Sequence, residues 1–353
     1  MLTLPLKKDI ETKEILKKSI KANSAIAKLN GVSKIIPNQM ILINALTLQE
    51  AKDSSEIENI ITTHDELYLA SVSEKFSKEV KEVINYKEAL IYGYEQVKKT
   101  KLLTLNDIIK IQSIITGNSA GIRKQIGTVL KNDKTGEVIY TPPQHYDEIM
   151  KLLENLFLYI NDDSLEDYDY LLKMALIHFQ FESIHPFYDG NGRSGRILNV
   201  LYLVLKDLLE LPILYLSQYI IKHKSDYYRL LQEVRTKQNY EEWILFMLDA
   251  VEKTSNNTCD LIESIEKMMN NTQKLVQEKL PKIYSKDLIE TLFLHPYTKI
   301  EFLVDRLKLH RHTASKYLKE LVNIGILKEI KIGRNRYFVN IELFEYLKKE
   351  INK

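Results

Sequence analysis

The sequence predicts a mostly α protein with one β-hairpin in its core and a winged helix-turn-helix at its C-terminal end. Eleven glycines and eight prolines are few for 353 residues, so few positions interrupt regular structure. Apolar residues recur at helical spacing in several long segments. Two β-prone runs flank a polar turn between residues 123 and 140.

Three segments show the helical pattern most clearly. Residues 80–97 and 104–115 repeat aliphatic side chains every three or four positions, and Thr104 or Asn106 is suited to cap the second helix. Residues 169–183 form a third apolar helix that ends directly before His185. His178 and Glu182, inside that helix, are expected to be buried packing or hydrogen-bonding residues.

The predicted hairpin lies between the second and the third of these helices. Ile126, Val129 and Leu130 precede the turn Lys134-Thr135-Gly136, and Val138 to Tyr140 follow it. Thr141-Pro142-Pro143 ends the second run.

The C-terminal segment has its own pattern. Helices are predicted over 285–294, 299–307 and 310–324, followed by a hairpin whose strands flank Lys331-Ile332-Gly333-Arg334-Asn335. This order is typical of a winged helix-turn-helix. Residues 281–353 hold 15 Lys and Arg against 9 Asp and Glu, a net charge of +6, whereas the whole chain carries +2.

The third of these helices has a polar, basic face: His310, Arg311, His312, Thr313, Ser315, Lys316 and Lys319. Such residues suit DNA phosphates and major-groove edges. Winged helices also serve as dimerisation or protein-docking modules, and the sequence leaves both uses open.

The chemistry is concentrated in the twelve residues from His185 to Arg196. A neutral imidazole at His185 can accept a proton, and Asp189 offers a hard carboxylate to a magnesium ion. The run Gly190-Asn191-Gly192 before a helix leaves backbone N–H groups pointing at one spot, where an anion can bind. Arg193 and Arg196 lie three apart on one helix face and suit phosphate oxygens.

This stretch resembles the core motif of Fic-domain proteins, His-Pro-Phe-x-(Asp/Glu)-Gly-Asn-Gly-Arg-x-x-Arg, at every fixed position. The resemblance implies a Fic-type helical core that transfers AMP from ATP to a protein Ser, Thr or Tyr hydroxyl and releases diphosphate. His185 would be the general base, and Asp189 would hold Mg²⁺ on the phosphates. The implied nucleotide contacts in this loop are Gly190, Asn191, Gly192, Arg193, Ser194, Gly195 and Arg196, with Asn191 near the α-phosphate and Arg196 at the γ-phosphate.

The resemblance extends to the predicted hairpin. Residues Arg123 to Tyr140 resemble the family's flap, which lies over the active site and pairs with an extended segment of the target protein. The flap residues expected near the nucleotide are Ile126, Gly127, Thr128 and Val129. Tyr227 or Tyr228 is expected near the adenine, with Arg235 further along the helix, although helix packing explains the two tyrosines equally well.

A second motif lies far upstream. By pattern alone, Ser54 to Asn59 would be a capped helix start with exposed acids. Ser54, Glu58 and Asn59 also resemble the family's inhibitory motif, (Ser/Thr)-x-x-x-Glu-(Gly/Asn). A Glu58 carboxylate paired with Arg196 would remove the cation that orients the γ-phosphate. In some family members this Glu also orients water for removal of AMP, which the sequence does not decide here.

Length and composition indicate several domains. The expected units are 1–95 with the inhibitory helix, the core 96–253, a helical connector 254–280 and the winged helix 281–353. Cys259 is the only cysteine, which favours a reducing compartment. No secretory signal pattern and no apolar run of roughly 18 residues is present, so a cytoplasmic location without membrane insertion is expected.

Two functional classes compete. One is an autoinhibited protein adenylyltransferase, expected to form a homodimer and able to modify itself. The other is a transcription regulator whose core only senses nucleotide. The intact set of His185, Asp189, Arg193 and Arg196 favours the enzyme, because a sensor needs no base. Transfer of another phosphate-linked group, such as phosphocholine, is a remote third option.

Overall fold

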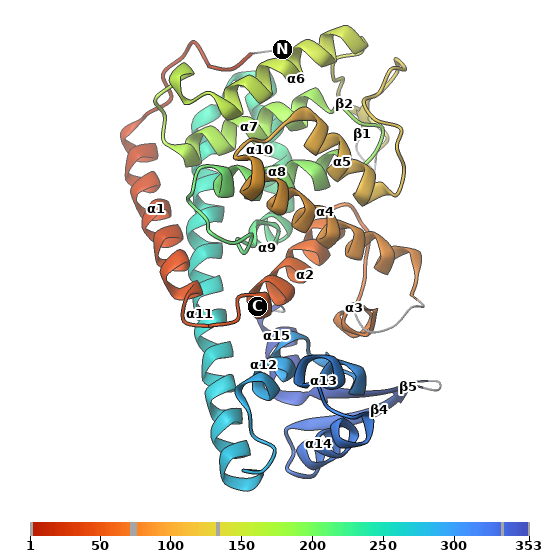
Figure 1. The fold of residues 1–353 in the computed structure, drawn as a ribbon. Helices are drawn as coiled ribbons and strands as arrows, with labels where there is room; N and C mark the ends of the chain where they lie inside the picture. Colours follow the sequence, from red (N-terminus) through yellow and green to blue (C-terminus); the bar gives the residue numbers. More distant parts are fainter. Residues whose placement is uncertain (1–2, 71–75, 132–134, 333–334, 352–353) are drawn as a thin grey trace.

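The computed structural model describes residues 3–70, 76–131, 135–332 and 335–351. Helices dominate this part of the chain, and the strands form only two small sheets (Figure 1). The predicted mostly α class is therefore confirmed.

Two helices form the centre of the core. α7 (Tyr170–Ile184) is buried on all sides from its second residue onward, and α8 (Asn191–Leu205) packs against it. Further helices pack around this pair, as Figure 1 shows. They are α2 (Met40–Ile57), α4 (Lys78–Thr100), α5 (Leu105–Thr116), α6 (Tyr146–Asn161), α9 (Leu216–Lys222) and α10 (Lys224–Lys237), with a short 3₁₀ helix at Asp163–Leu165.

Local capping fixes where the core helices begin. Thr104, not Asn106, caps α5, because its hydroxyl accepts from the Asp107 N–H while the Asp107 carboxylate accepts from the Thr104 N–H. Asp169 caps α7 through the Leu171 N–H. Both helices thus start within a residue of the predicted position.

A long helix runs along one side of the molecule. α11 (Tyr240–Lys279) has 40 residues, and α1 (Lys13–Ser33) packs alongside it (Figure 1). The predicted boundary between residues 253 and 254 falls inside α11, and the one between 95 and 96 falls inside α4. Each of these helices continues without a break across the predicted boundary.

The hairpin strands are shorter than predicted. β1 (Leu130–Lys131) pairs antiparallel with β2 (Val138–Tyr140), and the predicted turn residue Lys134 lies outside the described residues. Residues 126–129 are not in a strand. The Gln144 side chain accepts from the Gly127 N–H at 2.7 Å and donates to the Thr128 carbonyl at 2.9 Å, so it replaces a neighbouring strand there.

The C-terminal unit, residues 281–351, has the predicted three helices and hairpin. In chain order its elements are α12 (Lys286–Leu294), β3 (Tyr297–Thr298), α13 (Ile300–Leu307), α14 (Arg311–Asn323), β4 (Leu327–Ile332), β5 (Asn335–Asn340) and α15 (Ile341–Ile351). The antiparallel sheet has the order β3-β5-β4. Strand β3 and helix α15 were not predicted, and the turn residues Gly333 and Arg334 lie outside the described residues.

This unit packs directly on the N-terminal helices. Asn38 donates to Glu290 of α12 at 2.8 Å, and Tyr68 of α3 (His64–Ala70) contacts the ring of Phe344 in α15. Figure 1 shows α12 and α15 next to α2. Within the described ranges, we find no helix with the length and apolarity needed to cross a bilayer.

Candidate active site

His185 occupies the turn between α7 and α8. It is the C-cap residue of α7 and has a left-handed backbone, with φ of 48°. Arg123, itself buried, donates from Nε to the His185 carbonyl at 2.8 Å and from its backbone N–H to the Pro186 carbonyl. Burial lowers the pKa of His185 to about 4, and the charges of Arg123 and Arg235 act in the same direction. The imidazole is therefore neutral at physiological pH and can accept a proton.

The loop after His185 is held by its own side chains. Phe187 is buried, and the Asn191 amide accepts from the Phe187 N–H and donates to the Phe187 carbonyl, both at 2.8 Å. Both ends of the Asn191 side chain are thus used inside the loop. Its contribution to a bound phosphate would come from the backbone.

The start of α8 offers backbone donors to an anion. Gly190 precedes the helix with φ of 81°, and the first helical bond of this turn joins the Ser194 N–H to the Gly190 carbonyl. The N–H groups of residues 191–193 therefore point out of the helix N-terminus. Ser194 is buried and Gly195 packs against α7, where a Cβ would lie 2.5 Å from Glu182. Both residues therefore pack against the protein interior.

Arg193 and Asp189 stand at the open side of the loop. The Arg193 side chain is only 3% exposed and pairs with Glu82 at 2.9 Å and with Asp189 at 3.4 Å. The Asp189 side chain is 69% exposed. A single exposed carboxylate beside a helix N-terminus that can bind phosphates fits Mg²⁺, which usually takes one or two carboxylates together with substrate phosphates and water. The described residues include no cluster of three or more His, Cys, Asp or Glu that could hold a metal alone.

Arg196, the second arginine, is enclosed by the end of α2. Its guanidinium donates to the Ser54 hydroxyl, to the Ser54 carbonyl and to the Glu58 carboxylate, each at 2.8 Å. Ser54 is buried in the last turn of α2, and Glu58 is the C-cap residue of that helix. The alternative in which Ser54 caps a helix start is therefore wrong, because its hydroxyl serves Arg196 instead.

The Glu58 carboxylate lies very close to the loop at Gly192. Although burial favours its neutral form, attraction by Arg196, assisted by Arg193 and Lys224, lowers its pKa. A Cβ on Gly192 would lie 2.2 Å from Glu58 Oε1, so only glycine at this position leaves room for the carboxylate. Asn59 follows with φ of 63°, and its side chain accepts from Lys224 at 3.2 Å.

The residues behind the loop form a buried network. His178 contacts the Tyr227 hydroxyl at 2.8 Å and stacks on Trp243, as expected for a buried packing residue. Tyr227 is 1% exposed and packs in the core, whereas Tyr228 is 45% exposed. Of the two tyrosines expected near the adenine, only Tyr228 is substantially exposed.

Glu182 is also buried behind the loop, one helical turn before His185. One of its carboxylate oxygens has no hydrogen-bond partner among the described residues. Burial raises its pKa to about 7 against the attraction of Arg196.

The flap is anchored to the core near His185. Tyr140 donates to the Ser183 carbonyl at 2.9 Å, and the Arg235 guanidinium lies 4.0 Å from the centre of the Tyr140 ring. A cavity of about 670 Å³ opens between this end of the flap, α7, α10 and α11. Ile126, near the start of the flap, is 71% exposed. The flap thus has a fixed base and an exposed apolar side chain close to it.

The sequence did not identify three residues that shape this site: Arg123 as a clamp on His185, Glu82 as the partner of Arg193, and Gln144 as the anchor of the flap. Arg123 was noted only as a flap boundary. The two prolines directly before Gln144 mark a chain reversal, but nothing in the sequence gives its partners.

Comparisons with known proteins agree with this geometry. The N-terminal model of the Fic/DOC family matches residues 16–95, the Fic/DOC family model matches residues 102–203, and the C-terminal domain model of SoFic-like protein adenylyltransferases matches residues 268–343. A probable protein adenylyltransferase of Aquifex aeolicus is 28% identical over 195 residues, which cover 54% of this chain and 57% of that protein. The protein adenylyltransferase fic-1 of Caenorhabditis elegans is 28% identical over 101 residues, or 27% of this chain and 18% of that protein. The chain thus spans less than two thirds of these relatives.

Solved structures share the fold. A Fic family protein from Desulfovibrio desulfuricans G20 superposes with a TM-score of 0.59 at 19% identity, over 93% of this chain and 96% of that one. Fic-1 of C. elegans gives a TM-score of 0.55 at 20% identity, over 69% and 70% of the two chains. The two Fic/DOC models fall on the helices that carry Glu58, His185 and Arg196, and the chain belongs to the Fic/DOC family.

Proposed function

We propose that this protein transfers AMP from ATP to a hydroxyl of a target protein, and that Glu58 keeps it largely inactive at rest. The observation that carries the proposal is the pairing of Arg196 with Glu58 beside an intact His185 turn. Relatives named protein adenylyltransferases support the reaction class.

The proposed reaction uses His185 as the base. The target hydroxyl attacks the α-phosphorus of ATP, the bond to the β-phosphate oxygen breaks, diphosphate leaves, and His185 takes the hydroxyl proton. Its lowered pKa supports this role because the ring is neutral before the reaction. The first N–H groups of α8 would hold the phosphates. Asp189 would hold Mg²⁺, which neutralises phosphate charge when bound.

Autoinhibition follows from the bonds of Arg196. A buried guanidinium that already donates to Ser54 and Glu58 has fewer donors left for the γ-phosphate. The Glu58 carboxylate also places negative charge next to Gly192, where phosphate oxygens would lie. ATP bound against this carboxylate would be misplaced, and a misplacement of about 1 Å can cost roughly a hundredfold in rate.

The target would dock along the flap. The exposed side chain of Ile126 supports docking of an extended segment along the flap, and the cavity at the flap base offers room for a neighbouring side chain. The basic face of α14 supports a further role in DNA binding, which would place the enzyme on DNA.

The experiment is mass spectrometry of the purified protein after incubation with ATP and Mg²⁺. An adduct with the mass of AMP less water, on a Ser, Thr or Tyr, is expected with Glu58→Gly and is expected to disappear when His185→Ala is added. An adduct that persists without His185 would overturn the assignment of the base. An adduct of different mass would identify another phosphate-linked donor.

A further inference from the structure

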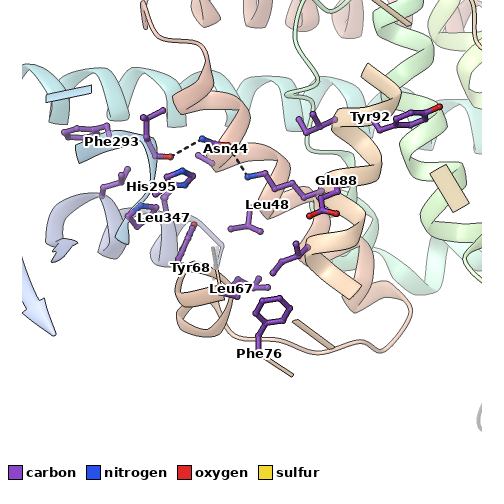
Figure 2. Close-up of a pocket in the computed structure, with 18 of the residues that line it drawn as sticks. Asn44, Leu48, Leu67, Tyr68, Phe76, Glu88, Tyr92, Phe293, His295 and Leu347 are labelled. Carbon is purple, nitrogen blue, oxygen red and sulfur yellow. Dashed lines mark hydrogen bonds between the residues drawn. The ribbon is translucent and has the colours of Figure 1, made fainter. Parts of the chain in front are cut away.

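A half-open cavity of about 610 Å³ lies where the C-terminal unit meets α2, α3 and α4, apart from the His185 turn (Figure 2). Side chains of α2, α3, α4 and the C-terminal unit form its walls, and most of them are aliphatic or aromatic. They include Leu48, Leu67, Tyr68, Phe76, Phe293 and Leu347. A volume of this size is in the range of small-molecule sites.

One positive charge stands in the wall of this cavity. Lys87 of α4 donates from Nζ to the side-chain amide oxygen Oδ1 of Asn44 at 3.1 Å, and among the described residues no carboxylate forms an ion pair with it. Burial lowers the pKa of Lys87 to about 8, although the charge of Glu88 opposes the shift. An amide oxygen is a weak partner for a partly desolvated ammonium, which an anion would satisfy better.

The other ionisable groups of the lining do not supply that anion. Glu88 and Glu95 are exposed side chains of α4 at the rim. Burial, together with the charge of Lys87, lowers the pKa of His295 to about 4, so this imidazole is neutral. Figure 2 shows His295 beside Asn44 on the wall formed with the C-terminal unit.

We propose that this cavity binds a small apolar molecule with a single anionic head group, such as a carboxylate. The head group pairs with Lys87 Nζ, and the apolar body lies against the aliphatic and aromatic walls. Ala45 and Leu48 of α2 line the cavity, so an occupant contacts the same helix that holds Glu58 against Arg196. The binding itself does not depend on the proposed AMP transfer.

The test uses the full chain and the probe 8-anilinonaphthalene-1-sulfonate, an apolar monoanion whose fluorescence rises in apolar sites. Decanoate and decan-1-ol, which share a chain length but differ in charge, serve as competitors. We expect decanoate to displace the probe at a concentration roughly tenfold or more below that of decanol, because only the carboxylate gains a charged hydrogen bond.

Three variants complete the design. Lys87→Met should remove the preference for decanoate, whereas Lys81→Met, an exposed lysine of the same helix, should keep it. Ala45→Phe should fill the cavity and abolish displaceable probe binding, with thermal melting to show that it is folded. No displaceable binding to the wild type would overturn the site. Equal competition by decanoate and decanol in the wild type would overturn the head-group assignment, because it would show that Lys87 contributes nothing to the choice of ligand.

Discussion

The turn between α7 and α8 and the outer face of α14 both carry basic side chains. Only in the turn are these side chains buried and held by specific partners. The side chains of Arg193 and Arg196 are 3% and 1% exposed, and both are paired with carboxylates. On α14, the side chains of Arg311 and Lys316 are 69% and 67% exposed. An unpaired buried charge is costly, so each arginine of the α7–α8 turn needs a specific partner. The exposed side chains of α14 are hydrated by solvent and do not need one.

The difference bears on how function can be inferred in each region. In the α7–α8 turn, the partner of Arg196 is a carboxylate at the end of a distant helix, and the proposed autoinhibition rests on that specific pair. On α14, the pairs Arg311–Glu301 and Lys316–Glu320 are the kind that surface helices commonly form. They do not distinguish a DNA-binding face from a protein-docking face.

The largest expected effect compares the two arginines directly. Arg196→Met leaves the Glu58 carboxylate and the Ser54 carbonyl without their donor, and we expect a loss of about 3 kcal/mol in the free energy of unfolding. Arg311→Met removes an exposed pair and should change it by less than about 0.5 kcal/mol. Urea titrations followed by circular dichroism measure both. Similar midpoints for the two variants would show that burial does not separate these regions.

The next effect concerns activity. Glu58→Gly frees Arg196 for a phosphate and should raise AMP transfer roughly a hundredfold, measured with α-labelled ATP. Glu56→Gly is the matched control, since it places the same flexible residue in the last turn of α2 without touching Arg196. Autoinhibition by Glu58 is contradicted if both variants transfer AMP at the wild-type rate.

A third effect is the pH dependence of stability that the buried Glu182 introduces. Its pKa is about 7 in the folded protein against an ordinary value of 4.5, so the folded state holds the proton more tightly. Its contribution to stability is therefore complete below pH 4.5 and is lost as the pH rises to about 7. Glu182→Gln should reduce the loss between these pH values by roughly 3 kcal/mol, since each unit of difference in pKa corresponds to about 1.4 kcal/mol.

The measurement for Glu182 is a series of urea midpoints at several pH values. Glu154→Gln, an exposed side chain on α6, serves as the control and should follow the wild-type profile. Parallel profiles for the wild type and Glu182→Gln would mean that the pKa of Glu182 is the same in the folded and unfolded protein, which contradicts the effect of burial.

The two regions also differ in what the sequence could predict. The motif from His185 to Arg196 is local, so its residues and the helices on either side could be identified from neighbouring positions. Ser54 and Glu58 could be connected to Arg196 only through the family resemblance, since 138 residues separate Glu58 from Arg196. The clamp from Arg123 to the His185 carbonyl spans 62 residues and has no local signal.

The other differences between the predicted and the observed structure also have physical causes. β3 has two residues, too few to show an alternating pattern, and it exists because β5 offers it a free edge. The sequence of residues 126–129 predicts a strand, but the Gln144 side chain forms hydrogen bonds with the Gly127 N–H and the Thr128 carbonyl. Tyr227 and Tyr228 are adjacent, and only the packing of α10 decides that the first is buried and the second exposed.

The smallest expected effect tests the α14 face itself. If it binds DNA, affinity for a duplex oligonucleotide should fall steeply with salt, and Lys316→Gln should weaken binding and lower the salt slope by about one. Lys98→Gln, in the last turn of α4 and away from the C-terminal unit, should leave the slope unchanged. Fluorescence anisotropy of the full chain measures both. A wild type whose affinity shows no salt dependence would overturn DNA binding by the α14 face, because lysines that neutralise phosphates must release counterions when they bind.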